Sequence, residues 1–348
     1  MRLVLVSVAG VLSLALAACG GDSSTPTPTP TPTPTGTPTP TPTPTAVAYA
    51  TSETALQYTI EGGVQRVANT QSVAPAMGSV FAFTPAQNGY TYTLLNGTVN
   101  PSPSEAAIFT AASTKTCDVA ALCFGSAFFF QQITAGAGNY YLSRFITGPG
   151  NPLMALSYAA FGTFEEAFLD AAGPRQHVDL RPFAYGISSP AGAIPTTGTA
   201  TFNGLLTGHA TGNKPGATGT SNIYQVNGTS QLVVNYAAGT ATLKLVLHGD
   251  AIGCGTAATP ACSPDINLTY DSTAGTLASG VLTFTLPNGG SARFFLAGGV
   301  AAVPATATTP AIVAVAPLEV AGSFALTAAD PNEAGVTMVI AGAGGGLR

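Results

Sequence analysis

Charge, tryptophan and long apolar runs are scarce in this 348-residue chain. Only 7% of the residues are charged, and the 10 Lys and Arg residues are scattered along the sequence. Nucleic-acid binding requires clustered positive charge, so this class of partner is excluded. After the N-terminus, no stretch reaches 18 consecutive apolar residues, so we expect no transmembrane helix. Because Trp is absent, aromatic stacking must come from Tyr and Phe.

Motifs of common enzymes are also missing. The sequence has no Gly-x-Ser-x-Gly elbow, no His-Glu-x-x-His and no phosphate loop. Two His-x-Asp pairs, His177 with Asp179 and His248 with Asp250, could be metal pairs or acid–base pairs. We favour ordinary polar positions on strand faces. The prediction is a protein that is not an enzyme, with no catalytic residue, no metal site and no cofactor.

Two further residue pairs could carry function. Glu165 and Glu166 could be a catalytic carboxylate pair, but adjacent residues seldom share a face, and we predict the solvated start of a short helix ending at Leu169. Tyr140 and Tyr141 could form a platform for a ligand, although burial within a pair of strands is favoured.

The N-terminus resembles that of bacterial lipoproteins. One charge, Arg2, precedes the apolar run Leu3–Leu16, which is too short to span a membrane well and is typical of a signal peptide. Small residues then lead to Cys19, as in the lipoprotein cleavage box. The resemblance implies that residues 1–18 are removed and that Cys19 carries the lipid. Gly20 stands where an aspartate would signal retention, which resembles the outer-membrane sorting pattern of lipoproteins in Gram-negative bacteria and implies that location.

Residues 19–45 are predicted to form a stalk. The segment from Thr25 to Thr45 is almost pure Thr-Pro, broken once by Gly36. Proline fixes φ and removes amide donors, so the stretch favours an extended polyproline conformation. At about 3.1 Å per residue, some twenty residues would reach roughly 60 Å. We therefore expect a spacer between the lipid and a globular body, whether or not it is glycosylated.

The four remaining cysteines fall in two close pairs. They allow three disulfide connectivities, and the short intervening loops favour Cys117–Cys123 and Cys254–Cys262. A metal site is the rival interpretation, but neither spacing matches a zinc pattern and no His lies near either pair. Disulfides fit an oxidising compartment outside the cytoplasm.

The C-terminal half alternates between apolar and polar residues. In the segment Thr240–His248, the residues Ala241, Leu243, Leu245 and Leu247 share one face, a period typical of a half-buried strand. Runs of the same kind, separated by turn residues, give eight strands from Gly198 onward. Closure of eight antiparallel strands would remove exposed edges, so we predict an up-and-down barrel, with a two-sheet sandwich as the alternative. Polar residues on the second face argue against a membrane barrel.

The N-terminal half of the body shows less regular patterns. Short strands are expected at Val80–Phe83, Tyr90–Leu94 and Ser126–Ile133, and an apolar stretch at Leu153–Phe164. The resulting division is a β-rich handle-like domain at residues 46–180 and a barrel at residues 181–348, which makes the body all-β.

Several segments occur in an order that resembles transferrin-binding-protein-B-like surface lipoproteins. They are Tyr185-Gly186-Ile187, the Gly-Thr-Ala-Thr-aromatic run from Gly198 to Phe202, and Glu319-x-x-Gly-x-Phe ending at Phe324. The resemblance covers about residues 155–348 and implies an eight-stranded barrel, a sheet-like handle before it and a lipid-anchored stalk. Relatives bind iron proteins or haem through variable loops, so no ligand-binding residue can be carried over. The stretch Gly298–Pro317 is expected to be an extended surface loop.

These features predict an outer-membrane surface lipoprotein, anchored in the membrane by its N-terminal lipid. It would bind a protein, haem or small solute, serve iron acquisition, and pass its ligand to an outer-membrane transporter. A structural or adhesive surface protein without a small-molecule ligand is the alternative. Fold alone does not choose between the two, because one fold hosts many functions.

Overall fold

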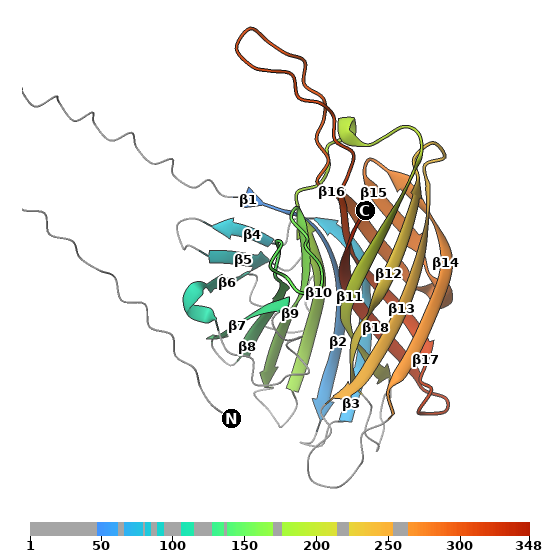
Figure 1. Cartoon of the computed structure of the whole chain (residues 1–348). Helices are drawn as coiled ribbons and strands as arrows, with labels where there is room; N and C mark the ends of the chain where they lie inside the picture. The colour runs from blue at the N-terminus through green and yellow to red at the C-terminus, as the bar shows by residue number, and fades with distance from the viewer. Residues whose placement is uncertain are drawn as a thin grey trace, which may run out of the picture. The chain divides into compact units, whose positions relative to one another are not determined.

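The computed structural model describes residues 47–61, 66–78, 81–84, 89–93, 106–114, 127–135, 138–169, 176–213, 223–252 and 264–348 (Figure 1). The signal segment, Cys19 and the stalk lie outside these residues, as do Cys117, Cys123, Cys254 and Cys262. Lipidation and both disulfides therefore stay predictions. Within the described ranges, no helix has the length and apolar character needed to cross a bilayer.

The C-terminal part is a closed barrel of eight strands, which confirms the predicted all-β fold. Each strand pairs antiparallel with the next, and the last pairs with the first, so the topology is up-and-down. The strands are β11 (Thr199–Asn213), β12 (Ile223–Asn235), β13 (Thr240–Ile252), β14 (Ile266–Ala278), β15 (Val281–Thr285), β16 (Ser291–Ala297), β17 (Glu319–Ala329) and β18 (Thr337–Leu347).

The barrel interior is filled by apolar side chains, as the period-two pattern predicts. On β13, Leu243, Leu245 and Leu247 point inward and are almost fully buried, and they pack in one cluster with Phe284 and Phe294 from β15 and β16. The barrel is therefore a packed core and not a channel, in keeping with the interior of an eight-stranded barrel.

Two antiparallel sheets precede the barrel. The larger has the order β3 (Arg66–Gly78), β2 (Ala50–Glu61), β10 (Gln176–Gly186), β9 (Ala159–Leu169), β8 (Gly138–Phe145), β7 (Phe128–Ala135). The smaller has the order β1 (Val47–Ala48), β4 (Phe81–Thr84), β5 (Gly89–Thr93), β6 (Ala106–Thr110). Short 3-10 turns lie at Ala111–Ser113, Ala191–Ala193 and Pro287–Gly289.

The six-stranded sheet has a packed layer on each face. One face meets the four-stranded sheet through an aromatic cluster that includes Phe81, Tyr92 and Phe183. The other face meets the outer wall of the barrel, where small residues such as Ala321 and Ala343 allow close packing against Phe161. Strands β2, β9 and β10 contact β17 and β18 along this second interface (Figure 1).

Two predictions about residues 46–180 are wrong. The helix expected at Glu165–Leu169 is part of strand β9, which pairs on both sides, with β8 and with β10. The domain boundary at residue 180 falls inside β10, because that strand is held between β2 and β9 as a member of the six-stranded sheet. The barrel begins only at Thr199, after the connection that leaves β10.

The stretch between β16 and β17 forms a long hairpin that stands away from the barrel in Figure 1. Paired backbone hydrogen bonds join Val300 to Val315 and Val303 to Ile312. The surface loop predicted at Gly298–Pro317 is thus present, with more internal pairing than the sequence indicated. It carries no charged residue, and it exposes Val313 to 80%.

Candidate functional site

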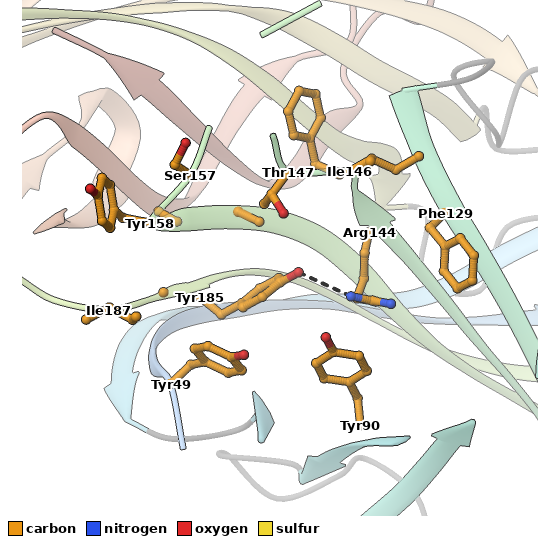
Figure 2. A pocket seen from close by; sticks show the side chains of 14 residues that line it. Tyr49, Tyr90, Phe129, Arg144, Ile146, Thr147, Ser157, Tyr158, Tyr185 and Ile187 are labelled. Carbon is orange, nitrogen blue, oxygen red and sulfur yellow. Dashed lines mark hydrogen bonds between the residues drawn. The ribbon is translucent and has the colours of Figure 1, made fainter. Parts of the chain in front are cut away.

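The candidate site is a pocket of about 380 Å³ next to the junction of the two sheets (Figure 2). Tyr49 follows β1 and Tyr90 lies on β5 of the smaller sheet, whereas Arg144 and Tyr185 come from β8 and β10 of the larger one. Further wall residues are Phe129, Phe145, Ile146, Thr147, Ser157, Tyr158, Ala159, Ala160, Gly186 and Ile187. The lining is mainly aromatic and aliphatic, with hydroxyl groups and a single arginine, which is typical of a small-molecule site.

Arg144 is the cation of this pocket. Strand alternation places it on the same face as Tyr140 and Leu142, toward the smaller sheet, where it contacts Phe81 and Tyr185 of the same aromatic cluster. Its guanidinium carbon lies 4.4 Å from the ring centre of Tyr90 and 5.4 Å from that of Phe129. These are cation–π distances, which hold the group in place while leaving its in-plane N–H donors available.

The donors of Arg144 are under-used. Nη1 donates to the Tyr185 hydroxyl at a long 3.4 Å, a contact drawn in Figure 2. The Nε atom is buried and has no hydrogen-bond partner among the described residues. No carboxylate in that part of the chain forms an ion pair with Arg144. A half-buried guanidinium whose Nε has no described partner is suited to a carboxylate, which a guanidinium can bind through two parallel hydrogen bonds.

Tyr49 and Tyr185, which lie around Arg144, remain protonated at neutral pH. Burial raises the pKa of Tyr49 and of Tyr185, and the neighbouring phenols raise the pKa of Tyr49 further, whereas Arg144 partly offsets both shifts. A protonated phenol can donate a hydrogen bond as well as accept one. The pocket therefore offers hydroxyl donors beside a fixed positive charge, and no described anionic side chain that would repel an anion lines it.

Glu319 fixes one wall of the pocket from the barrel. Its buried carboxylate accepts hydrogen bonds from the backbone N–H groups of Ser157, Tyr158 and Ala159 at 2.6, 2.8 and 2.8 Å. This role explains the Glu of the Glu-x-x-Gly-x-Phe segment as a structural clamp. Tyr158 also lies over Gly298, where φ is +76° and a Cβ atom would come 2.6 Å from the ring, so the base of the projecting hairpin adjoins the same wall.

A buried charge cluster lies deeper in the same pair of sheets. Arg181 forms ion pairs with Glu53 at 2.8 Å and with Asp179 at 2.9 Å, and all three side chains are almost fully buried. Gln57 donates to Asp179 at 2.9 Å, and the Tyr92 hydroxyl donates to Glu53 at 2.5 Å. Because its members satisfy one another and none lines the pocket, we assign this cluster to the core of the sheets.

The structure gives the residues that the sequence singled out different surroundings. Asp179 belongs to the buried charge cluster, and His177 lies two residues before it on β10. Glu165 and Glu166 are adjacent on β9 and point to opposite faces, so they do not form a catalytic pair. Tyr140 is buried in the aromatic cluster between the sheets, as the favoured interpretation predicts.

His248 and Asp250 lie together as a polar group. The distance from His248 Nε2 to Asp250 Oδ1 is 3.0 Å, on the outer face of the barrel. The pocket around Arg144 was not predicted. Its residues come from strands far apart in sequence, and the sole local signal was an isolated arginine in an apolar strand of a chain with few cations.

Among known proteins, similarity is found with solved structures. No protein family matches the sequence, and no curated protein matches it. Among solved structures, the chain is similar to a double mutant of transferrin binding protein B from Haemophilus parasuis Hp5, with 11% identity, a TM-score of 0.36, and coverage of 80% of this chain and 47% of that one. A single mutant of the same protein gives 12% identity, a TM-score of 0.32, and coverage of 80% and 48%.

The chain thus spans about half the length of the structures it matches. At these identities and TM-scores, the likeness concerns the β fold alone. Membership of the transferrin-binding-protein-B-like family stays a prediction.

Proposed function

We propose that this chain is a lipid-anchored binding protein of the cell envelope, not an enzyme, and that it holds a small organic anion in the Arg144 pocket. The observation that carries the proposal is the half-buried Arg144, whose Nε atom has no described partner, facing an aromatic cavity. Of the three ligand kinds expected from the sequence, a small solute fits best, since about 380 Å³ is near the lower end of small-molecule pockets.

The chemical class of ligand follows from the walls of the pocket. Arg144 and the hydroxyl of Tyr185 would bind a carboxylate, and the rings of Tyr49, Tyr90 and Phe129 would pack against an apolar or aromatic body. Attachment to the outer membrane through Cys19, the stalk as a spacer, and delivery to a transporter for iron acquisition complete the proposal. They rest on the sequence pattern.

The binding step can be tested with a defined probe. Benzoate and longer aryl carboxylates would be titrated into the full-length chain in detergent by calorimetry, with benzamide as the uncharged match. We expect Arg144→Gln to weaken carboxylate binding by about 10- to 100-fold, the value of a charge-assisted hydrogen bond. Arg293→Gln, which removes a charge from barrel strand β16, serves as the matched control. Equal binding by both variants, or no binding by the unaltered chain, would overturn the pocket assignment.

The anchor needs a separate experiment. Labelling of cells with radioactive palmitate should mark the unaltered chain and leave Cys19→Ser unmarked. Protease treatment of intact cells should then remove the body if it is exposed at the surface. Unlabelled wild-type protein would exclude the lipid anchor without affecting the pocket assignment.

One observation favours the adhesive alternative. The hairpin between β16 and β17 exposes Val300, Val303, Ile312, Val313 and Val315 on a segment without charge, and exposed apolar clusters often mark contact surfaces. Removal of residues 301–316 should reduce surface attachment of cells if this function is correct, with carboxylate binding unchanged. Attachment that is unaffected by the deletion would eliminate the alternative.

A further inference from the structure

A second polar cluster lies on the outer face of the barrel, where β13 approaches its end and β14 begins. His248 and Asp250 are two residues apart on β13 and therefore share a face, with side chains about half exposed. Asp265 is the residue before β14, and Asn267 on β14 lies directly opposite His248 in the strand register. Sequence spacing indicates only the first two residues, because the other two come from the neighbouring strand.

The three ionisable side chains converge on one point. His248 Nε2 lies 3.0 Å from Asp250 Oδ1 and 4.0 Å from Asp265 Oδ2. These three atoms all lie within 4.8 Å of one another. Three ligand atoms bound to one zinc ion at about 2.0–2.1 Å stand roughly 3.3 Å apart in a tetrahedral site. The two distances from His248 bracket that value, so small side-chain rotations would bring all three atoms to a common ion.

The other ring nitrogen is oriented as in a metal-bound histidine. His248 Nδ1 lies 2.9 Å from Asn267 Oδ1, an oxygen that can only accept a hydrogen bond. In the tautomer that carries its proton on Nδ1, Nε2 would present its lone pair toward the two carboxylates, as a bound metal ion requires. Metal-binding histidines are held in this way, with the second nitrogen donating to an oxygen. An imidazolium ring would satisfy the same distances without a metal, and the titration below distinguishes the two.

Charge balance also favours a cation. In the described part of the chain, no Lys or Arg forms an ion pair with Asp250 or Asp265. On the same two strands, by contrast, Lys244 pairs with Asp271 at 2.8 Å. A divalent ion would neutralise both carboxylates at once. Imidazole combined with carboxylates suits zinc and other late first-row metals better than calcium or magnesium, which prefer oxygen ligands alone.

We propose that His248, Asp250 and Asp265 bind a divalent transition metal ion of the zinc class on the outer barrel wall. Asn267 would be a positioning residue that fixes the histidine ring. Three protein ligands leave at least one coordination position open to water or to another donor. This proposal is independent of the Arg144 pocket, which lies among other strands.

The test is a zinc titration of the full-length chain in detergent, after removal of metals with a chelator. We expect one equivalent bound with micromolar affinity, lost in His248→Ala and in Asp250→Asn. Asn267→Ala should keep the three ligands and weaken binding by about 10- to 100-fold. Asp271→Asn removes an acid of β14 that lies outside the cluster. It is the matched control and should bind zinc as the unaltered chain does.

Circular dichroism would show that each variant is folded before its titration is compared. Absence of zinc binding by the unaltered chain would overturn the proposal and assign the cluster to an imidazolium paired with its carboxylates. Undiminished binding in His248→Ala would overturn it as well, by placing the ion elsewhere in the molecule.

Discussion

Strands β10 and β13 have similar lengths but differ in the pattern of their buried residues. On β13, exposed and buried residues alternate, because one face lines the barrel interior and the other meets solvent. On β10, nine consecutive residues are buried, since the strand lies between the smaller sheet and the barrel wall. The six-stranded sheet is therefore a middle layer, and it is the place where the molecule carries its buried charges and its pocket.

The largest expected effect is a difference in stability loss between substitutions in the buried charge cluster and on the barrel surface. Arg181→Met would leave Glu53 and Asp179 buried without their partner, and we expect a loss of about 3–5 kcal/mol in the free energy of unfolding. Lys244→Met removes an exposed partner of Asp271 and should cost less than about 1 kcal/mol. Urea unfolding measures both. Similar losses in the two variants would mean that the cluster is not buried as described.

Alanine substitutions can test the difference in burial along the two strands. On β10, Leu180→Ala and Phe183→Ala affect opposite faces, and each should cost about 2–5 kcal/mol because both side chains are buried. On β13, Leu245→Ala should cost as much, whereas the neighbouring Val246→Ala, at a 40% exposed residue, should cost less than about 1 kcal/mol. If either β10 substitution cost less than about 1 kcal/mol in the same unfolding experiment, the layered arrangement would be contradicted.

The link between barrel and pocket can be weakened at Glu319. Glu319→Gln replaces one acceptor oxygen by an N–H donor that faces backbone N–H groups of the 157–159 segment. We expect a loss of about 1–3 kcal/mol in stability, together with weaker carboxylate binding because Tyr158 and Ser157 line the pocket. Calorimetry of the folded variant checks the second effect, and unchanged affinity would show that this wall does not position the ligand.

The smallest effects are two pH dependences of opposite sign. Burial raises the pKa of Glu165 to about 7, so the folded protein holds a proton that the unfolded chain releases above about pH 4.3. The free energy of unfolding then falls as pH rises from about 4.3 to 7. Burial lowers the pKa of His209 to about 4, so its contribution to stability is lost as pH falls from about 6.5 to 4.

Single variants should remove one slope each. Glu165→Gln on β9 should flatten the decline toward neutral pH, and His209→Gln on β11 should flatten the decline toward acid. Unfolding curves across this pH range would show the change. If Glu165→Gln or His209→Gln kept the pH dependence of the unaltered chain, the pKa of that residue would not be shifted by burial as described.

The contrast between the two regions also explains what could be predicted from sequence. Thr240–His248 is half-buried, and its period-two pattern therefore predicts both the strand and its inner face. Residues Gln176–Gly186 are covered on both faces, and the polar residues Asp179 and Arg181 are buried, so polar positions do not mark solvent and the pattern does not show that the strand belongs to the sheet. For Glu165–Leu169, two adjacent acids predict a solvated helix start, whereas pairing with β8 and β10 makes the segment a strand.

The sites depend on contacts across strands. The Arg144 pocket brings together residues from Tyr49 to Ile187, which are far apart in sequence, and no local motif connects them. Asp265 and Asn267 reach His248 only through the register of β13 and β14. Composition and periodicity determine the barrel, while both candidate sites require the pairing of strands to be known.

The most direct test of the pocket is the side-chain N–H signal of Arg144 in a nitrogen-15 NMR spectrum of the full-length chain. Arg144→Gln assigns the signal by its disappearance. The account predicts that added benzoate shifts the Arg144 Nε–H signal and leaves that of the buried Arg181 in place. A spectrum in which benzoate leaves Arg144 unchanged would contradict it.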